Sequence, residues 1–412
     1  MHVLIYSYNY HPEPIGIAPL MTELAEGLVN RGHQVRVVTG MPNYPERRVY
    51  DEYQGKFYLT EKRNGVTIQR SYVRINNPNP GLIDRLILDG SFITTSFFQA
   101  IIRWRPDVIF ATVPPLPISL PVGWCGFAYG SPIVLNVQDI VSEAAVRVEL
   151  IKQDGLVIKA ARGLENLAYK TAAKISVISD RFVDKLVEQG VSKSKIVCIP
   201  NWVDVNFIKP LDKQNAFRQT HQLQDKFVVL YSGNIALTQG LETVIKAAAN
   251  LKHIPEIAFV IIGEESALGN LKQFCQAYDA NNVLLLSFQP REKLPETLAA
   301  ADVALVVQKK RVTAFNMPSK IPVLLASGRA IVASVPETGT AMKAVEESGG
   351  GVVVPPEDAD ALSSTIMELF KNPEKVEALG RQGRKYAEEN YSLEAALNRY
   401  EALFSELLIA NR

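Results

Sequence analysis

The sequence of 412 residues contains few cysteines and no long uninterrupted apolar run. Its three cysteines, Cys125, Cys198 and Cys275, are widely spaced, so we interpret them as thiols of a reducing compartment and not as a disulfide framework or zinc site. A membrane-spanning helix needs about 18 consecutive apolar residues. The nearest candidate, 116–137, is interrupted by prolines and predicts a loop and a helix before a strand. The N-terminus reads as a strand without a charged leader, which predicts a cytoplasmic chain.

The chain also lacks a strong net charge and the common nucleotide-binding motifs. Its formal charge is +1, which gives no general field for polyanions, so nucleic acid is not an expected partner. No GxGxxG follows the first strand of either half of the chain, and GxxxxGK[ST] is absent from the sequence. A nicotinamide cofactor or a P-loop site therefore has no support, and we expect no cofactor.

Two successive runs of alternating strand and helix patterns indicate an α/β fold. The first run begins with an apolar strand at 3–6, and the pattern restarts with a strand at 227–231. The joint at 200–210 is rich in Pro and Asn and has no clear period. The sequence therefore predicts two doubly wound domains, 1–203 and 204–390, a size that suits 412 residues.

A cationic loop in the second half is the strongest candidate for chemistry. The apolar strand 303–307 is followed by three cations and then by the segment NMPSK. We expect Ser319 to cap a helix that runs through Leu325 and stops at Gly328. Free amides at a helix start together with nearby lysines favour phosphate binding. The alternative is a solvated cationic loop before an ordinary capped helix.

Glycines follow the first strand of both halves, where open parallel sheets bind ligands. These are Gly16 in the first half, and Gly233 and Gly240 in the second. If the two domains face each other, both loops line one cleft. Each glycine can equally be a simple turn or helix start.

Several segments together resemble the family 4 glycosyltransferases over essentially the whole chain. They include YNYHPEPIGIAPLMTELAEGLVNRGHQVRVVTGMPNYP, YSGNIALTQGLETVIKAA, LAAADVALVVQ, MPSKIPVLLASGRAIVAS, PETGT and GGGVVVPPEDADAL, and the likeness is greatest to the branch that builds exopolysaccharides such as colanic acid. The resemblance implies the GT-B fold, with two Rossmann-like domains facing a central cleft. It implies retaining transfer from a nucleoside-diphosphate sugar, with the donor in the second domain and the acceptor against the first. It also implies that a helix within 391–412 packs back toward the first domain.

The resemblance supports some of the expected donor contacts, but at other positions the family's residues are missing. The residues that we expect at the donor, from the resemblance and from the cationic loop, are Gly16, Gly233, Asn234, Gln239, Gly263, Gln289, Lys309, Ser319, Lys320, Glu337, Gly339 and Thr340. Asn234 and Gln239 stand where many members have an arginine and a lysine on the diphosphate. We expect Lys309, Lys310 or Lys320 to replace that charge. The family's paired glutamates would fall on Phe315 and Val323, which are not acidic.

In the first domain, Asp139 and Glu143 lie in a segment where the family often places a histidine or aspartate beside the reacting carbon. Gln138 would replace the histidine, and we expect Asp139, then Glu143, to contact the sugar or orient the acceptor hydroxyl. The alternative is a helix-capping Asp139 with Glu143 as an exposed carboxylate in the first turn. His11, in the loop of Gly16, is a further candidate for contact with donor or acceptor.

Other features suggest partners or exclude them. The DxD pattern at Asp358 and Asp360 begins a helix, so we expect it to cap that helix and expect no metal. Arg103, Trp104, Arg105 and the apolar stretch 114–124 are candidates for peripheral contact with the inner membrane, where lipid-linked acceptors reside. Two other functions remain open: a nucleotide-sugar epimerase of the same fold, and a non-catalytic scaffold in a glycan-assembly complex. The sequence does not identify the nucleotide, sugar or acceptor.

Overall fold

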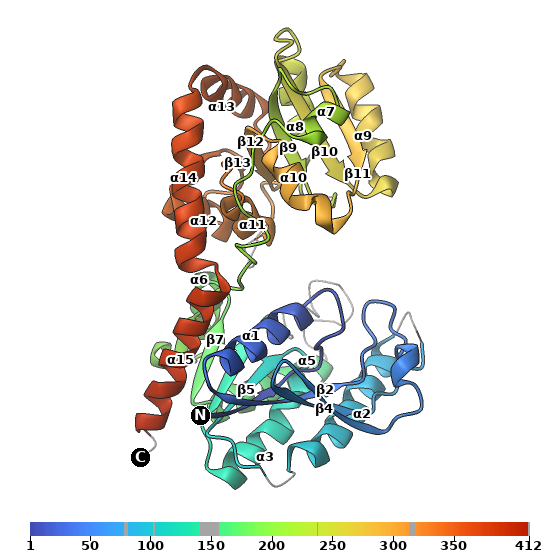
Figure 1. Ribbon diagram of the computed structural model, residues 1–412, viewed down its shortest axis with the longest axis vertical. Coiled ribbons are helices and arrows are strands. Elements are labelled where there is room, and N and C mark those ends of the chain that lie inside the picture. The colour runs from blue at the N-terminus through green and yellow to red at the C-terminus, as the bar shows by residue number, and fades with distance from the viewer. Residues whose placement is uncertain (78–80, 102–103, 141–155, 237, 313–317, 411–412) are drawn as a thin grey trace. The chain divides into compact units, whose positions relative to one another are not determined.

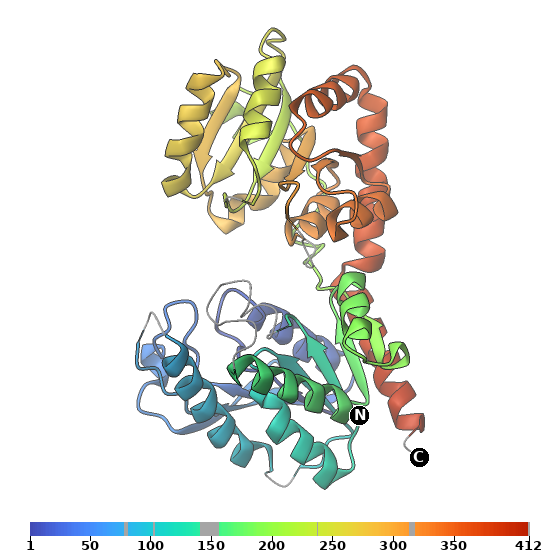
Figure 2. The ribbon, with the colours of Figure 1, turned by 180° about the vertical axis from the view of Figure 1, so that it is seen from behind.

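The computed structural model describes residues 1–77, 81–101, 104–140, 156–236, 238–312 and 318–410 (Figures 1 and 2). These residues form two compact α/β units, Met1–Asn201 with Ala396–Arg412, and Trp202–Ala395. Each unit contains a mainly parallel sheet with helices packed against it, which confirms the predicted fold class.

The sheet of the first unit has the strand order β3-β4-β2-β1-β5-β6-β7-β8. Its strands are β1 (His2–Tyr6), β2 (Gln34–Gly40), β3 (Tyr58–Arg63), β4 (Val66–Ser71), β5 (Val108–Val113), β6 (Ile133–Val137), β7 (Lys174–Val177) and β8 (Ile196–Cys198). The helices are α1 (Ala18–Asn30), α2 (Leu82–Ala100), α3 (Ser119–Tyr129), α5 (Leu156–Thr171) and α6 (Asp180–Glu188), with short 3₁₀ turns η1 (Asp51–Tyr53), η2 (Leu116–Ile118) and η3 (Lys193–Lys195). Asn64 and Gly65 form the hairpin turn that joins β3 to β4, the antiparallel pair. Every residue of β5 and β6 is buried because helices cover both faces of a parallel sheet.

The last helix, α15 (Leu393–Ala410), contributes most of its length to this first unit. The ring of Tyr400 lies 5.1 Å from that of Phe110 in β5, and its hydroxyl accepts a hydrogen bond from Asn136. Glu401 pairs with Arg31 and His33 at the end of α1. Aromatic burial and an ion-pair cluster therefore fix α15 to the sheet.

The sheet of the second unit has the order β11-β10-β9-β12-β13-β14. Its strands are β9 (Phe227–Ser232), β10 (Ile257–Gly263), β11 (Val283–Ser287), β12 (Val303–Val307), β13 (Ala330–Ser334) and β14 (Gly351–Val354). Its helices are α7 (Ala216–Thr220), α8 (Glu242–Asn250), α9 (Glu265–Ala277), α10 (Leu294–Ala299), α11 (Lys320–Ala326), α12 (Thr340–Ser348), α13 (Ala359–Lys371) and α14 (Pro373–Asn390), with the turn η4 (Arg291–Lys293). Neighbouring strands are parallel throughout. The strand order changes direction between β9 and β12, which pair only at Val303 with Val229 and Ala304 with Leu230.

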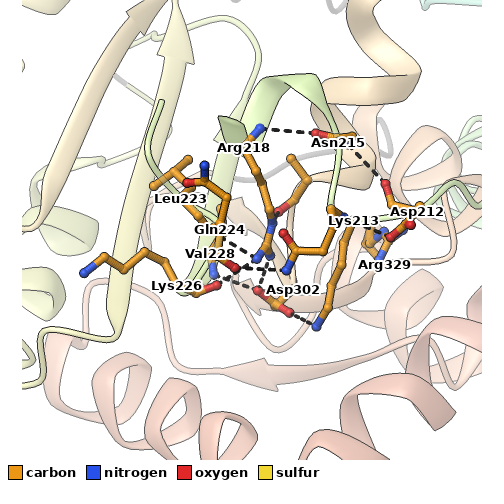
Figure 3. Close-up of polar contacts among 12 residues, drawn as sticks. Asp212, Lys213, Asn215, Arg218, Leu223, Gln224, Lys226, Val228, Asp302 and Arg329 are labelled. Carbon is orange, nitrogen blue, oxygen red and sulfur yellow. Dashed lines mark hydrogen bonds and ion pairs between the residues drawn. The ribbon is translucent and has the colours of Figure 1, made fainter. Parts of the chain in front are cut away.

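A buried ion-pair network fixes the amino end of β12 (Figure 3). The carboxylate of Asp302 accepts hydrogen bonds from Arg218 at 2.5 Å and from Lys213 and the backbone amide of Val228 at 2.8 Å. Arg218 is 1% exposed, and its guanidinium also donates to the carbonyl of Ala300. Any arrangement that separates the partners would leave a buried charge uncompensated. The network therefore stabilises one arrangement of β9, β12 and α7.

We predict that Asp302→Ala lowers the free energy of unfolding of the second unit by about 3 to 5 kcal/mol, because it leaves the Arg218 guanidinium buried without its counter-ion. Urea denaturation followed by circular dichroism measures the change. The control is Glu377→Ala, which breaks the solvent-exposed pair with Arg381 on α14 and should change the free energy by less than about 1 kcal/mol. Equal effects of the two substitutions would contradict a structural role for the network.

Candidate functional site

Two loops meet at the topological switch point of the second sheet. One follows β9 and contains the glycines Gly233 and Gly240, and the other follows β12. The backbone amide of Lys309 donates to the carbonyl of Thr238 at 2.8 Å, which joins the loops. The side chain of Lys309 lies against Gly240, where an added Cβ would come within 2.9 Å of its Cγ. The switch point is where an open parallel sheet leaves room for a ligand.

A pocket of about 590 Å³ opens at this carboxyl edge of the sheet. Its wall includes the predicted donor residues Gly233, Asn234, Gln239, Gln289, Ser319 and Lys320. The remaining lining residues are Ser232, Ile262, Phe288, Arg291, Leu294, Thr297, Leu298, Pro318, Val323 and Leu324. Half of the residues predicted for the donor thus line one pocket, although they come from separate segments of the sequence.

The ammonium group of Lys320 is the distinctive charge of this pocket. Its Nζ is buried and makes no hydrogen bond among the described residues, and it lies 3.8 Å from the ring centre of Tyr231. The Tyr231 hydroxyl donates to the carbonyl of Asn234, so the ring is held in place. Burial lowers the pKa of Lys320 to about 8. A cation–π contact offsets only part of the desolvation cost, so the ammonium is suited to an anionic ligand.

Gly233 is required for this placement of Lys320. Its φ is 141°, a conformation that residues with a side chain rarely adopt. A Cβ at this position would come within 3.0 Å of the Lys320 Nζ and 3.3 Å of its Cε. The second-domain glycine loop therefore allows backbone and ammonium to approach closely.

The expected cap at Ser319 is wrong. Ser319 occupies the N-cap position of α11, but its backbone is in the helical region and its side chain makes no capping hydrogen bond. A capping hydroxyl reaches the amides of the first turn from an extended backbone, which this residue does not have. Because α11 spans only 7 residues, the side-chain cation of Lys320 and not the helix dipole dominates the local charge.

Other predicted donor residues make contacts within the loops or lie near the pocket. Gln239 accepts a hydrogen bond from the Ala236 amide and so braces the glycine loop. The open side of Gly263 is filled by Ile235, whose Cδ1 would lie 2.2 Å from an added Cβ. Gln289 is exposed, and its amide donates to the carbonyl of Ser287.

Glu337, Gly339 and Thr340 lie after β13, where the sequence analysis missed helix α12. Gly339 is the N-cap of that helix, and Thr340 is its first residue. The Thr340 hydroxyl is buried and makes no hydrogen bond among the described residues. Small and apolar residues at helical spacing (Ala341, Ala344, Val345) before Gly349 are the signal that could have predicted this helix.

Two further pocket residues were not predicted individually. Phe288 is 49% exposed and lines the pocket, where it offers an aromatic face for stacking. Arg291 adds a second cation to the same wall. Val323, at one of the two positions of the family's glutamates, contributes an apolar wall instead, and Phe315 lies outside the described residues. An exposed aromatic in a loop after a strand was the available signal for Phe288.

A larger cavity of about 680 Å³ lies at the opposite, amino edge of the same sheet. Its lining includes Asp302, Arg329 and the first residues of β9 and β13. Ligands of parallel sheets bind at the carboxyl edge. Most of the charges lining this cavity form ion pairs with each other, including Lys213 with Asp302 and Arg384 with Glu388. We therefore assign this cavity a structural role and the smaller pocket a functional one.

In the first unit, the loop after β1 is fixed by a carboxylate that the sequence analysis missed. Glu13 is 4% exposed and accepts hydrogen bonds from the amides of Asn43 and Tyr44 and from the side chain of Asn9. Burial raises the pKa of this carboxyl, and the three donors oppose the rise. Gly16 in the same loop is exposed and has a φ of 72°. A buried acid with converging amides thus holds the predicted glycine loop open.

His11 lies half-buried in this loop. Its carbonyl accepts a hydrogen bond from Arg70, and its amide donates to Thr22. Burial, reinforced by the charges of Arg63 and Arg70, lowers the pKa of the imidazole below its ordinary value. The ring is therefore neutral at pH 7 and can accept or donate one hydrogen bond.

The predicted catalytic residues after β6 are only partly described. The Asp139 carboxylate accepts a hydrogen bond from the Ile140 amide, and Glu143 lies outside the described residues. The Gln138 side chain exchanges hydrogen bonds with Asn201 and donates to Asn136 at 2.6 Å. Gln138 therefore bonds to the protein itself, and Asp139 stays the candidate of this segment.

The expected role of the DxD pattern as a helix cap agrees with the structure. The Asp358 carboxylate accepts a hydrogen bond from the Ala361 amide at 2.8 Å at the start of α13. Asp360 accepts from the side chain of Asn250. Both carboxylates thus have local partners.

The predicted membrane-contact segment is only partly at the surface. Trp104 is partly buried, stacks on His2 at 5.3 Å and lies under the guanidinium of Arg36. The Arg105 guanidinium donates to the carbonyl of Tyr129, and Arg103 lies outside the described residues. Leu120 and Trp124 are exposed. None of the described helices is both long and apolar enough to cross a membrane.

Both halves of the chain match models of known domains. Residues 16–202 match the glycosyl transferase 4-like domain, and residues 212–386 match the glycosyl transferases group 1. The chain is 31% identical over 408 residues to WcaI of Escherichia coli (strain K12), a glycosyl transferase named for colanic acid biosynthesis, with 97% of this chain and 98% of WcaI covered. The chain belongs to the group 1 glycosyltransferases. The resemblance to family 4 is therefore confirmed.

Further relatives and solved structures agree with this assignment. The glycosyltransferase is 26% identical over 306 residues to WbjE of Pseudomonas aeruginosa, with 74% of this chain and 76% of WbjE covered. Its fold resembles sucrose-phosphate synthase of Thermosynechococcus elongatus, with a TM-score of 0.69, 18% identity and 99% coverage of both chains. It also resembles Anabaena HepE in complex with UDP, with a TM-score of 0.70, 16% identity and coverage of 98% and 100%. The expected GT-B fold is confirmed.

We predict that Gly233→Ala in this glycosyltransferase lowers the free energy of unfolding by about 1 to 3 kcal/mol, because alanine is strained at this φ. The new methyl group should also push the Lys320 ammonium toward solvent and raise its pKa toward the ordinary lysine value. Urea unfolding and NMR titration of ¹³C-methylated lysines measure the two changes. Gly269→Ala in α9 is the control, since an added Cβ there has no heavy atom within 4 Å. An unshifted Lys320 resonance in Gly233→Ala would contradict the proposed contact.

Proposed function

We propose that this glycosyltransferase moves a sugar from a nucleoside-diphosphate sugar, with retention at the anomeric carbon, to a glycan or lipid-linked acceptor. By analogy with the colanic acid name of WcaI, the product is a bacterial exopolysaccharide or another cell-surface polysaccharide. The observation that carries the proposal is the buried ammonium of Lys320, which has no hydrogen-bond partner in the part of the chain that the structure describes and lies in the pocket of the second unit.

The charge of Lys320 matches the main electrostatic demand of glycosyl transfer. Breaking the bond between sugar and phosphate builds negative charge on the leaving diphosphate, and stabilising that charge lowers the barrier. Lys320 and Arg291 supply positive charge to one pocket wall, and Gly233 lets backbone approach the same point. The two cations take the place of the arginine and lysine that Asn234 and Gln239 replace.

The same arrangement supports chemistry without a metal. The acidic pair Asp358 and Asp360 accepts hydrogen bonds within the protein and lies at a helix start. The lysine and arginine of the pocket provide the positive charge that a divalent ion would otherwise supply. Glu337, Gly339 and Thr340, which follow β13, complete the proposed set of donor contacts, with Lys309 beside the glycine loop.

We assign acceptor contacts to the first unit. Gly16 gives the loop after β1 an open surface, and the neutral imidazole of His11 and the carboxylate of Asp139 can each orient a hydroxyl group. In retaining transfer the acceptor attacks from the face that the diphosphate leaves, and the leaving oxygen takes the acceptor proton. This route requires no dedicated base, so these residues act by positioning.

We further propose where the reaction takes place and which donors to test first. HepE was solved with UDP and with UDP-glucose, so uridine nucleotides head the panel, followed by GDP- and ADP-sugars. A chain that extends lipid-linked glycans works in the cytoplasm, at the cytoplasmic face of the inner membrane. A thermal-shift screen identifies the nucleotide, because a ligand that binds the native state raises the melting temperature.

We predict that purified protein transfers sugar from its donor to an acceptor, and that Lys320→Ala lowers kcat/KM by roughly 100-fold, as loss of a transition-state cation does. Lys272→Ala on the exposed face of α9 is the charge-matched control and should retain full activity. Product formation is measured by mass spectrometry, with EDTA present in a parallel reaction.

The alternatives give different results in this assay. An epimerase converts the donor without acceptor, and a scaffold neither hydrolyses nor transfers sugar. A rate that EDTA abolishes and Mg²⁺ restores would contradict metal independence. Unchanged kinetics of Lys320→Ala, with folding intact, would refute its role on the diphosphate.

We predict that affinity for a nucleoside diphosphate is constant below pH 8 and falls by up to about tenfold per pH unit above it. The pKa of Lys320 in the free protein is about 8. Above that pH the lysine must take up a proton before it can pair with the anion, and this lowers the affinity. Isothermal titration calorimetry from pH 7 to pH 9 measures the effect. In Lys320→Arg the decline should disappear, because arginine stays charged. An equal decline in both proteins would contradict the assignment.

A further inference from the structure

One solvent-facing side of α2 consists of uncharged residues. Its exposed residues at helical spacing are Ile83, Leu86, Gly90, Thr94 and Phe98. The two carboxylates of the helix are half-buried: Asp84 accepts a hydrogen bond from the Gly81 amide, and burial raises the pKa of Asp89 to about 6. Ile83 is 72% exposed, which is costly in water unless another surface covers it.

The neighbouring helix α3 continues this apolar surface. None of the residues from Ser119 to Tyr129 is charged, and Leu120, Trp124 and Phe127 point to solvent, with Phe127 88% exposed. Phe97 of α2 contacts Trp124 edge-on at 4.9 Å and Phe98 at 5.7 Å, so the two helices form one continuous aromatic surface.

The third helix of this face, α5, supplies positive charge. α2, α3 and α5 pack in sequence on one face of the first sheet, and Figure 2 shows them together as the blue, teal and green helices in front of the strands. Lys159, Arg162 and Lys170 are exposed on α5, beside the exposed Leu167. Among the described residues of the three helices, no Asp or Glu is exposed. The face is therefore cationic at α5 and mainly apolar at α2 and α3, where Arg85 is the one exposed charge among the described residues.

We propose that this face, formed by α2, α3 and α5, docks on a lipid surface with anionic headgroups. Trp and Phe side chains partition into the boundary between headgroups and acyl chains, and nearby lysines and arginines are attracted to anionic lipids. The absence of exposed carboxylates on the described part of the face matches that charge. This surface deepens the proposed function and rests on it in one respect, because a lipid-linked acceptor is presented at a membrane.

The face differs from the segment that the sequence suggested. It shares Leu120 and Trp124 with the predicted stretch 114–124, but its centre is Phe98 and Phe127. The cations that we assign to it are Lys159, Arg162 and Lys170 of α5. Helical periodicity over three separate helices, and not one cationic-aromatic stretch, creates the surface.

Vesicle flotation tests the proposal with the full-length chain. Wild-type protein should float with vesicles of equimolar phosphatidylglycerol and phosphatidylcholine, and less with phosphatidylcholine alone. Phe98→Ser/Phe127→Ser should reduce partition roughly tenfold or more, because the apolar anchors are lost. Lys159→Ser/Arg162→Ser should weaken binding to the anionic vesicles by about fivefold per cation, and raised salt should mimic that loss.

Controls separate this surface from folding and from donor binding. Ile409→Ser replaces an apolar residue of α15 that is 75% exposed, and this variant should float like wild type. Melting temperature and nucleoside-diphosphate affinity should be unchanged in the Phe98/Phe127 variant, so a failure of the donor site is detected separately. Wild-type protein that does not float, or variants that float equally, would overturn the proposal. So would a concentration-dependent dimer in sedimentation velocity that Phe98→Ser/Phe127→Ser abolishes, because a second copy would then cover the face.

Discussion

A buried lysine with no counter-ion among the described residues is the constraint around which the second unit is arranged. The ammonium of Lys320 lies over the Tyr231 ring and against Gly233, within the wall of a pocket at the carboxyl edge of the sheet. Removing an ammonium from water without pairing it costs stability. The neighbouring residues do not offset this cost. Val323 is apolar, and position 233 is a glycine, where a side chain would displace the ammonium. We propose that an anion, the leaving diphosphate of a sugar donor, binds there.

The doubly wound topology determines where this pocket forms. β9 and β12 pair at their amino ends only, so their carboxyl ends separate and the loops after them border an open space. The amide of Lys309 links the two loops, and Asp302 with Arg218 fixes the amino ends of the same strands. A buried ion pair thus lies at the amino edge of the sheet, opposite the pocket at its carboxyl edge. In the first unit, the buried carboxylate of Glu13 instead fixes the loop after β1 by accepting hydrogen bonds from two backbone amides.

Most of the fold could be predicted from hydrophobic periodicity, because the apolar strands and amphipathic helices are long and regular. The predicted strands 3–6, 227–231 and 303–307 occur within one residue of these bounds. The site was harder to predict, since strand order decides which loops meet. Lys320 was one of three candidate lysines, and only the structure shows its burial. The expected Ser319 cap failed because backbone geometry, not residue type, decides whether a hydroxyl reaches the helix amides. Phe288 and Glu13 carry no motif, and their positions depend on packing across the sheet.

The central claim is that the diphosphate of the donor binds against Lys320. The most direct test is a crystal structure of the full-length chain with a bound nucleoside diphosphate, chosen by the thermal-shift screen. The account predicts phosphate oxygens within hydrogen-bonding distance of the Lys320 Nζ and beside the backbone at Gly233, with the base near Phe288. A diphosphate bound elsewhere, with the Lys320 ammonium still unpaired over Tyr231, would contradict the account.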